Sequence, residues 1–153
     1  MKRFPLVEAI GFAVFLICDQ ITKIIVVHNL SYGASIPIID GFLHITNTHN
    51  TGTIWGLAQG GNMIFAILAI VVVILIVVLT PKVATTKIAR FAIGAILGGA
   101  IGNLLDRFVR GFVVDFIDFR VINFPVFNVA DIGIVCGAIT LGIFMFLTPQ
   151  KSN

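Results

Sequence analysis

The sequence predicts an all-α integral membrane protein in which four transmembrane helices carry a small extracytoplasmic β-rich lobe. Three observations predict this class. The mean hydropathy of the 153 residues is +1.09 and only 11% of them are charged, which is far outside the range of soluble globular domains. Four apolar runs are long enough to cross a bilayer core of about 30 Å. A glycine-rich segment, typical of turns, lies between the first two runs.

Residues 4–27 form the first predicted span. At about 1.5 Å of rise per residue, a run of this length crosses the bilayer core. The basic pair Lys2 and Arg3 precedes it, as in a secretory signal peptide, but a signal peptide has a shorter apolar region that ends at a small-residue cleavage site. We therefore expect a retained anchor. Asp19 and Lys23, four residues apart, can form an ion pair on one face of this helix.

Residues 29–61 differ in composition from the apolar runs. They contain Pro37 and six of the 15 glycines, and apolar and polar residues alternate over residues 42–46. Turn-forming residues next to a β-prone alternation predict strands joined by short loops. We expect this segment to form a small lobe outside the membrane core.

Three further spans follow at residues 62–80, 90–107 and 129–147, with an outer loop at residues 108–128. The second span is almost uniformly aliphatic, and we expect Pro81 to end it. The third is rich in glycine and alanine, and small residues allow helices to approach closely in lipid. We therefore expect the third helix to be central.

The basic residues indicate how the spans are oriented. Four spans place both termini on one side, together with the loop between the second and third spans. That side carries six of the ten basic residues: Lys2, Arg3, Lys82, Lys87, Arg90 and Lys151. By the positive-inside tendency it is cytoplasmic, and the opposite face, with six of the seven acidic residues, is where we expect the chemistry. The basic residues form no patch with interleaved aromatics, so we expect no nucleic-acid partner.

The cysteines and histidines do not predict a metal centre. Cys18 and Cys136 lie inside apolar runs, where a thiol behaves as a small apolar side chain. His28, His44 and His49 lie between the first two spans, but their spacing matches no ligand motif. We expect neither a metal ion nor another cofactor.

Four of the seven acidic residues lie within residues 103–131, between the last two spans. Carboxylates at a membrane face are costly and are typical of functional sites. Asp131 follows Asn128 by three residues, a spacing that predicts an N-cap and a first-turn acid at the start of the fourth helix. The positive end of the helix dipole favours an ionised carboxylate there, so capping and catalysis are compatible roles for Asp131.

Asp115 is enclosed by large apolar residues in the sequence Val-Val-Asp-Phe-Ile. Desolvation raises the pKa of a carboxyl group in such a setting, although a salt bridge to Arg107, Arg110 or Arg120 is the alternative. Two carboxyl groups whose pKa values differ can share one proton, so that one activates a water while the other polarises a carbonyl group. Asp115 and Asp131 are the candidates for such a pair.

The other two acids of this stretch have structural explanations. Asp118 stands two residues before Arg120, and we expect the two to pair at the surface. Asp106 lies at the C-terminal end of the third span, where the helix dipole disfavours a negative charge. Arg107 or a backbone donor must therefore stabilise Asp106.

Two other functional classes fit the composition. A small transporter or proton-relay subunit would use the acids of the spans, Asp19, Asp106 and Asp131, to pass protons. A metal-dependent lipid hydrolase would use the three histidines. Flux without peptidase activity would favour the first class, and loss of activity with a chelator would favour the second.

Five motifs in order give the chain a strong resemblance to the bacterial lipoprotein signal peptidases, also called signal peptidase II. They are Asp19-Gln20-Ile21-Thr22-Lys23, Asn50-Thr51-Gly52 with Trp55-Gly56, Gly102-Asn103-Leu104-Leu105-Asp106-Arg107, Val114-Asp115-Phe116, and Phe127-Asn128-Val129-Ala130-Asp131. The match covers nearly the whole chain, including the number and order of the spans. One departure is visible, because Thr53-Ile54 stands where the family usually has two alanines.

The resemblance implies an aspartic endopeptidase of the bacterial cytoplasmic membrane. Such an enzyme removes the signal peptide of prolipoproteins on the amino side of a diacylglyceryl-modified cysteine, needs no cofactor, and meets its substrate among membrane lipids. Asp115 and Asp131 match the catalytic pair. The positions matching residues that support the site or the substrate are Asn50, Gly52, Asn103, Asp106, Arg107 and Asn128, with Asp19 and Lys23 as a structural pair. We expect a monomer whose termini are cytoplasmic and whose active site is at the outer face.

Overall fold

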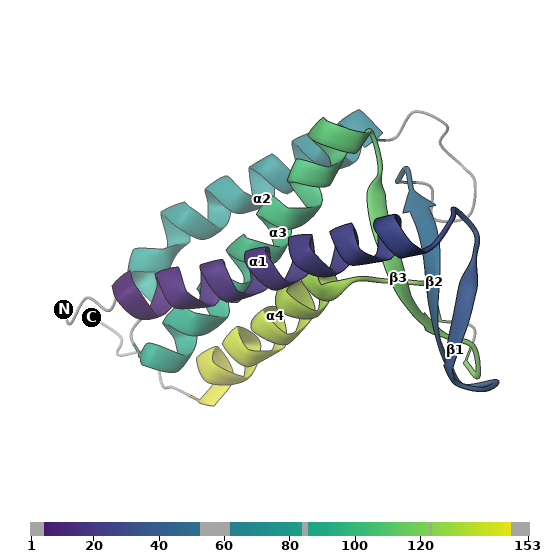
Figure 1. The fold of residues 1–153 in the computed structure, drawn as a ribbon. Coiled ribbons are helices and arrows are strands. Elements are labelled where there is room, and N and C mark those ends of the chain that lie inside the picture. The colour runs from purple at the N-terminus through teal and green to yellow at the C-terminus, as the bar shows by residue number, and fades with distance from the viewer. Residues whose placement is uncertain (1–4, 53–61, 84–85, 123, 148–153) are drawn as a thin grey trace.

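The structure is a computed structural model that describes residues 5–52, 62–83, 86–122 and 124–147. Its elements in chain order are α1 (Pro5–Asn29), β1 (Ser35–Ile39), β2 (Leu43–Asn50), α2 (Asn62–Val83), α3 (Lys87–Arg110), β3 (Val113–Phe119) and α4 (Val129–Leu147), as Figure 1 shows. The four helices are each long and apolar enough to cross a membrane. The predicted fold class of four spanning helices with a small β-rich part is confirmed.

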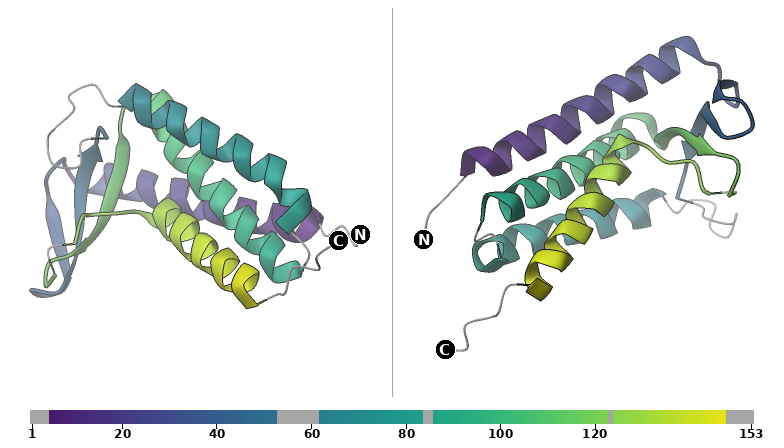
Figure 2. Two further views of the ribbon diagram at one scale, coloured as in Figure 1. Left: turned by 180° about the vertical axis from the view of Figure 1, so that it is seen from behind. Right: turned by 90° about the horizontal axis from the view of Figure 1, so that it is seen from below.

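The helices form a bundle, and the sheet stands across one end of it (Figures 1 and 2). α1 begins and α4 ends at the other end of the bundle, where α2 also leads into α3. α3 packs against all three other helices and is largely buried, whereas α1, α2 and α4 expose large aliphatic side chains such as Ile17, Ile74 and Ile139. The prediction that the third helix is central is confirmed.

Glycines explain how closely α3 approaches its neighbours. A Cβ atom on Gly94 would overlap the carbonyl oxygen of Glu8 in α1, and one on Gly98 would overlap that of Phe12. On the side of α4, a Cβ on Gly99 would overlap the carbonyl oxygen of Ala130. The backbones of α1, α3 and α4 are therefore in direct contact, which is the packing that small residues permit in lipid.

The sheet is antiparallel, with strand order β1-β2-β3. The first two strands lie in the segment expected to form the β-rich lobe, but β3 belongs to residues 108–128, which the sequence analysis treated as a loop. Its pairing with β2 places Thr48 opposite Asp115. The run of β-branched and aromatic residues in β3, Val-Val-Asp-Phe-Ile-Asp-Phe, is typical of a strand, and the expectation of an outer loop overlooked it.

Two helix ends differ from the expectation. α2 continues to Val83, so Pro81 lies in its last turn and does not end the helix. A proline removes one backbone donor, and near a helix end that loss is tolerated more easily than in the interior. α3 begins at Lys87, with the Thr86 hydroxyl accepting a hydrogen bond from the backbone N–H of Ala89 at 3.2 Å. Trp55, Gly56 and the departure at Thr53-Ile54 lie outside the described residues.

Candidate active site

Polar side chains converge where α1, α3, β3 and the start of α4 meet at the sheet end of the bundle. Six of them are almost completely buried: Asp19, Lys23, Asn103, Asp106, Asp115 and Asn128. Burial of charged groups is costly unless each is paired and hydrogen-bonded. The partners of these side chains therefore decide what the cluster can do.

Asp115 lies on β3, and its side chain accepts hydrogen bonds from two amide groups. Asn50 Nδ2 donates to Oδ2 at 2.9 Å, and Asn128 Nδ2 donates to Oδ1 at 2.7 Å. Only 3% of the residue is exposed. The pKa of Asp115 is raised to about 7, mainly by burial. The hydrogen bond from Asn50 lowers this pKa, and the negative charge of Asp131 raises it further. A carboxyl group with such a pKa can carry a proton near neutral pH.

Asp131 lies in the first turn of α4 and forms a capping box with Asn128. The backbone N–H of Asp131 donates to Asn128 Oδ1 at 3.0 Å, and the backbone N–H of Asn128 donates to Asp131 Oδ2 at 3.2 Å. The predicted N-cap is confirmed. Asn103 Nδ2 donates to the other oxygen of Asp131 at 2.9 Å. Both oxygens of Asp131 thus accept N–H groups.

Asn128 joins the two candidate carboxyl groups. Its side-chain amide donates to Asp115, and its backbone amide donates to Asp131. The residue is 0% exposed, so the link is shielded from solvent. β3 and the start of α4 thus bring each of the two aspartates into hydrogen-bond contact with one asparagine.

Lys23 lies at the centre of a buried ionic cluster beneath this pair. Its Nζ is 2.8 Å from Asp19 Oδ2 and 3.0 Å from Asp106 Oδ2, and all three side chains are 0% exposed. The predicted Asp19–Lys23 pair is confirmed. Asp106 is also paired with Arg110 and accepts the backbone N–H of Val114 at 3.1 Å. The expected backbone donor is therefore present.

Arg110 is a partner of Asp106 that the sequence analysis missed. The two residues are four apart on α3, which is the spacing of an ion pair on one helix face. That spacing could have predicted the pair. Arg107 donates from Nη1 to the carbonyl oxygen of Asn103 at 3.2 Å, and it lies within electrostatic range of Asp115, Asp131 and Asp106.

Gly52 holds Asn50 in place. Its backbone N–H donates to Asn50 Oδ1 at 2.8 Å, which leaves Nδ2 directed at Asp115. The φ angle of Gly52 is +87°, and a Cβ atom there would overlap the ring of Phe65. Glycine is required at this position for both reasons. Thr48, which the sequence analysis did not single out, donates from Oγ1 to the carbonyl oxygen of Asp115 at 3.0 Å.

Asp118 lies apart from the cluster. It accepts hydrogen bonds from Thr46 Oγ1 at 2.7 Å and from Arg120 Nε at 3.1 Å. Burial opposes ionisation of this carboxyl group, but the two hydrogen bonds outweigh that effect and lower its pKa. The expected pairing of Asp118 with Arg120 is confirmed.

His28 lies in the last turn of α1, and the other two histidines, His44 and His49, lie on β2. His44 contacts Ser35 Oγ through Nδ1 at 3.2 Å, and the ring of His49 stacks on Phe112 with centroids 3.7 Å apart. Within residues 5–52, 62–83, 86–122 and 124–147, no three His, Cys, Asp or Glu side chains are grouped so that they could hold a metal ion.

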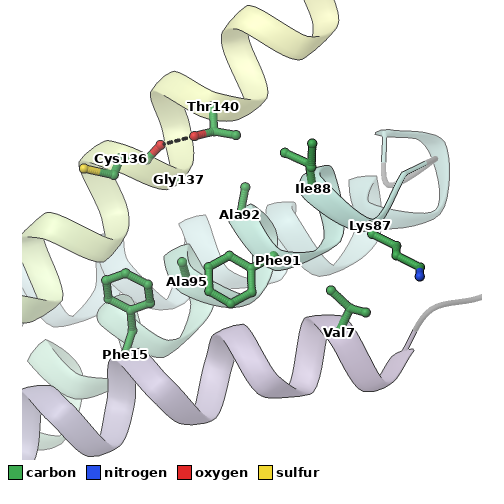
Figure 3. Close-up of a pocket in the computed structure, with 10 residues that line it drawn as sticks. All are labelled: Val7, Phe15, Lys87, Ile88, Phe91, Ala92, Ala95, Cys136, Gly137 and Thr140. Atoms are coloured by element: carbon green, nitrogen blue, oxygen red, sulfur yellow. Dashed lines mark hydrogen bonds between the residues drawn. The ribbon is translucent and has the colours of Figure 1, made fainter.

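A pocket of about 450 Å³ lies elsewhere, between α1, α3 and α4 toward the end of the bundle remote from the sheet (Figure 3). The residues that line the pocket are mostly apolar and include the aromatic rings of Phe15 and Phe91. Ala92 lies between these rings and α4. The one hydrogen bond drawn there, from Thr140 Oγ1 to the carbonyl oxygen of Cys136, lies within α4. The pocket offers no proton donor or acceptor comparable to the aspartate cluster, so we assign chemistry to the cluster.

Comparison with known proteins identifies the family. The family model described as signal peptidase (SPase) II matches residues 11–147. The chain belongs to the signal peptidase II family. The resemblance inferred from the five motifs is thereby confirmed, and with it the peptidase class. Family membership favours the peptidase over the transport and metal-dependent lipid hydrolase alternatives.

Relatives and solved structures agree with this membership. The lipoprotein signal peptidase of Geobacillus kaustophilus (strain HTA426) is 43% identical over 92% of this chain and 95% of its own length. That of Geobacillus thermodenitrificans (strain NG80-2) is 41% identical over 88% of both chains. Two bacterial membrane enzymes solved by the in meso method share the fold. The first has a TM-score of 0.86 and a sequence identity of 32%, and the match covers 99% of this chain and 98% of that one. The second has a TM-score of 0.87 and a sequence identity of 35%, and the match covers 97% of each chain.

Proposed function

We propose that this signal peptidase II cleaves prolipoproteins on the amino side of a diacylglyceryl-modified cysteine, with Asp115 and Asp131 as its catalytic pair. The observation that carries the proposal is the placement of both carboxyl groups on Asn128, one on its side chain and one on its backbone. Carboxyl groups arranged as a pair with unequal proton affinities catalyse peptide hydrolysis without a covalent intermediate.

The environments of the two groups suggest their roles. Burial raises the pKa of Asp115 to about 7, so it carries the shared proton and gives it to the carbonyl oxygen of the scissile peptide bond as the intermediate forms. Asp131 accepts N–H groups at both oxygens and acts as the ionised base. It takes a proton from a water molecule as the water oxygen attacks the carbonyl carbon.

The tetrahedral intermediate then collapses. The C–N bond breaks, the leaving amine of the lipid-modified cysteine receives the proton that Asp131 accepted, and the signal peptide leaves with a new carboxyl group. Asp115 recovers its proton from the intermediate. The pair is thereby restored without net consumption of protons by the enzyme.

The orientation proposed for the protein in the membrane follows from the distribution of its basic residues. Lys87 and Arg90, which begin α3, lie at the end of the bundle remote from Asp115 and Asp131. By the positive-inside tendency this end is cytoplasmic, so the aspartates lie at the outer face of the cytoplasmic membrane. A substrate anchored by its own acyl chains among membrane lipids reaches that depth by lateral diffusion. The enzyme acts as a monomer, because both carboxyl groups and their hydrogen-bond partners come from one chain.

The test is cleavage of a purified diacylglyceryl-modified prolipoprotein by enzyme reconstituted in liposomes. Asp115→Asn and Asp131→Asn should each reduce cleavage at least 1,000-fold, on the order of the loss expected when an essential acid or base is removed. Normal cleavage by either variant would refute the pair.

Asp118→Asn is the matched control, because Asp118 lies on the same strand as Asp115 but pairs with Arg120 outside the cluster. It should retain activity. If Asp118→Asn were as inactive as Asp115→Asn, loss of activity would report damage to β3 and would not support a catalytic role. Labelling of a single cysteine introduced at Asp118 or Lys87 by a membrane-impermeant reagent tests the orientation: the first should react from outside the cell and the second should not.

A further inference from the structure

Three asparagines direct their side-chain N–H groups at the proposed catalytic carboxylates. Asn50 and Asn128 donate to Asp115, and Asn103 donates to Asp131. A side-chain amide has a donor end and an acceptor end, so each could in principle be turned to present its oxygen instead. An oxygen turned toward a carboxylate would replace an attractive contact with a repulsive one. The orientation of each amide therefore matters for the site.

Each of these amides is held in its orientation by an N–H group that binds its oxygen. Gly52 N–H binds Asn50, and Asp131 N–H binds Asn128. Asn103 Oδ1 accepts from two groups, the ammonium of Lys23 at 2.8 Å and Nδ2 of Asn128 at 3.0 Å. Of these two donors, only Lys23 carries a charge. Because an ammonium only donates, the Asn103 atom that faces Lys23 must be its oxygen.

Lys23 is itself held by acceptors that also bind the backbone next to the catalytic pair. Its three N–H groups meet three acceptors, on Asp19, Asp106 and Asn103. Asp19 Oδ1 accepts the backbone N–H of Ala130, the residue before Asp131, at 2.9 Å. Asp106 Oδ2 accepts the backbone N–H of Val114, the residue before Asp115, at 3.1 Å.

The approach of Asp19 to α3 is also specified. A Cβ atom on Gly102, the residue before Asn103, would lie 2.6 Å from Asp19 Oδ2. Glycine at this position thus allows Asp19 and Lys23 of α1 to reach the asparagine. Lys23 is 0% exposed, so it can act on the reaction only through the residues that it contacts.

We infer that Lys23 is a positioning residue of the reaction, which together with Asn128 fixes the Asn103 amide so that it donates to Asp131. The inference rests on the proposed roles of Asp115 and Asp131. Loss of Lys23 removes the charged donor to Asn103 Oδ1 and leaves only the neutral donor of Asn128, so the Asn103 amide is held less firmly against Asp131. Misplacement of a catalytic group by about 1 Å costs on the order of 100-fold in rate. Substrate binding is unaffected, because Lys23 is enclosed by protein.

The test compares Lys23→Met in the wild-type and Asn103→Ala backgrounds, using kcat, KM and the thermal midpoint of the reconstituted enzyme. Lys23→Met should lower kcat about 100-fold with KM within about 3-fold of wild type. In the Asn103→Ala background, where the amide to be oriented is absent, it should lower kcat by less than about 3-fold further. A purely structural role would shift the thermal midpoint equally in both backgrounds and leave the kcat effects multiplicative.

Two further variants keep the outcome decisive. Asp19→Asn with Lys23→Met removes one negative and one positive buried charge together, and Asp106 keeps Arg110 as its partner. This double variant should show the same kcat loss and the same dependence on Asn103 if Lys23→Met alone does not fold. Arg90→Met is the matched control, because Arg90 also joins α3 to α1, through Glu8 at 2.8 Å, but far from the aspartates. It should lower the thermal midpoint without changing kcat.

The inference is overturned if the loss of kcat is the same factor in both backgrounds, if KM alone changes, or if Arg90→Met lowers kcat equally. These results leave the proposed function intact as long as Asp115→Asn and Asp131→Asn remain inactive. Activity in either aspartate variant would instead remove the catalytic pair, so the two failures are distinguishable.

Discussion

Replacing Asn50 by alanine should move the alkaline limb of the pH–rate profile to higher pH. Asp115 must be protonated in the proposed reaction, so the rate falls as pH rises through its pKa of about 7. The Asn50 Nδ2 group donates to Asp115 Oδ2 at 2.9 Å and favours the ionised form. Without this donor the ionised form is less stable, the pKa of Asp115 is higher, and the protonated group persists to higher pH.

The size of the displacement follows from the hydrogen bond. A hydrogen bond to a charged group contributes about 1.5–3 kcal/mol, and one pKa unit corresponds to about 1.4 kcal/mol. Water that enters the space left by the amide replaces part of this interaction. We therefore expect the alkaline limb of the pH–rate profile to move by about one pH unit, which corresponds to the lower end of this energy range. The apparent value belongs to the Asp115–Asp131 pair, so both limbs should be fitted together.

The assay is kcat for a lipid-modified prolipoprotein peptide in detergent micelles from pH 5 to pH 10. Asn47→Ala is the matched control, because Asn47 lies on the same strand, is 2% exposed and donates to the carbonyl oxygen of Leu30 at 2.8 Å. It should reduce stability and leave the profile in place. An alkaline limb that stays fixed in Asn50→Ala, or moves to lower pH, would refute the protonated role of Asp115.

Three further outcomes are expected. Gly98→Ala should lower the thermal midpoint, because its Cβ would overlap the carbonyl oxygen of Phe12 and overpacking costs about 1–3 kcal/mol. Gly142→Ala is the control and should leave the midpoint unchanged, because there is open space around Gly142. Equal midpoints in the two variants would contradict the close packing. Asn128→Ala should lose about 1 kcal/mol of stability, because the α4 cap is lost. It should also lose most of its activity, because the residue that contacts both Asp115 and Asp131 loses its side chain, and a fully active variant would count against this link. Chelators should leave cleavage unchanged, and a loss restored by added metal would exclude a mechanism of carboxyl groups alone.

The sequence alone was sufficient for the features that depend on neighbouring residues. Hydropathy over about 20 residues decides whether a helix is stable in a bilayer, and the four spans were predicted on that basis. The spacing of Asn128 and Asp131 predicted a capping box, because capping joins residues within one turn. The Asp19–Lys23 pair and the central position of the glycine-rich helix were predicted in the same way. These interactions are local, and their patterns can be read along the chain.

The assembly of the site was decided only by the tertiary structure. Val113–Phe119 is rich in β-branched and aromatic residues, which is typical of a strand, but only the tertiary structure shows that it pairs with β2. The link through Asn128 and the contacts of Lys23 with Asp106 and Asn103 join elements far apart in sequence. Composition and spacing indicated that Asp115 and Asp131 share one membrane face. Packing of β3 against the start of α4 determines that they share one asparagine, because side-chain distances depend on how elements dock and not on how each element forms.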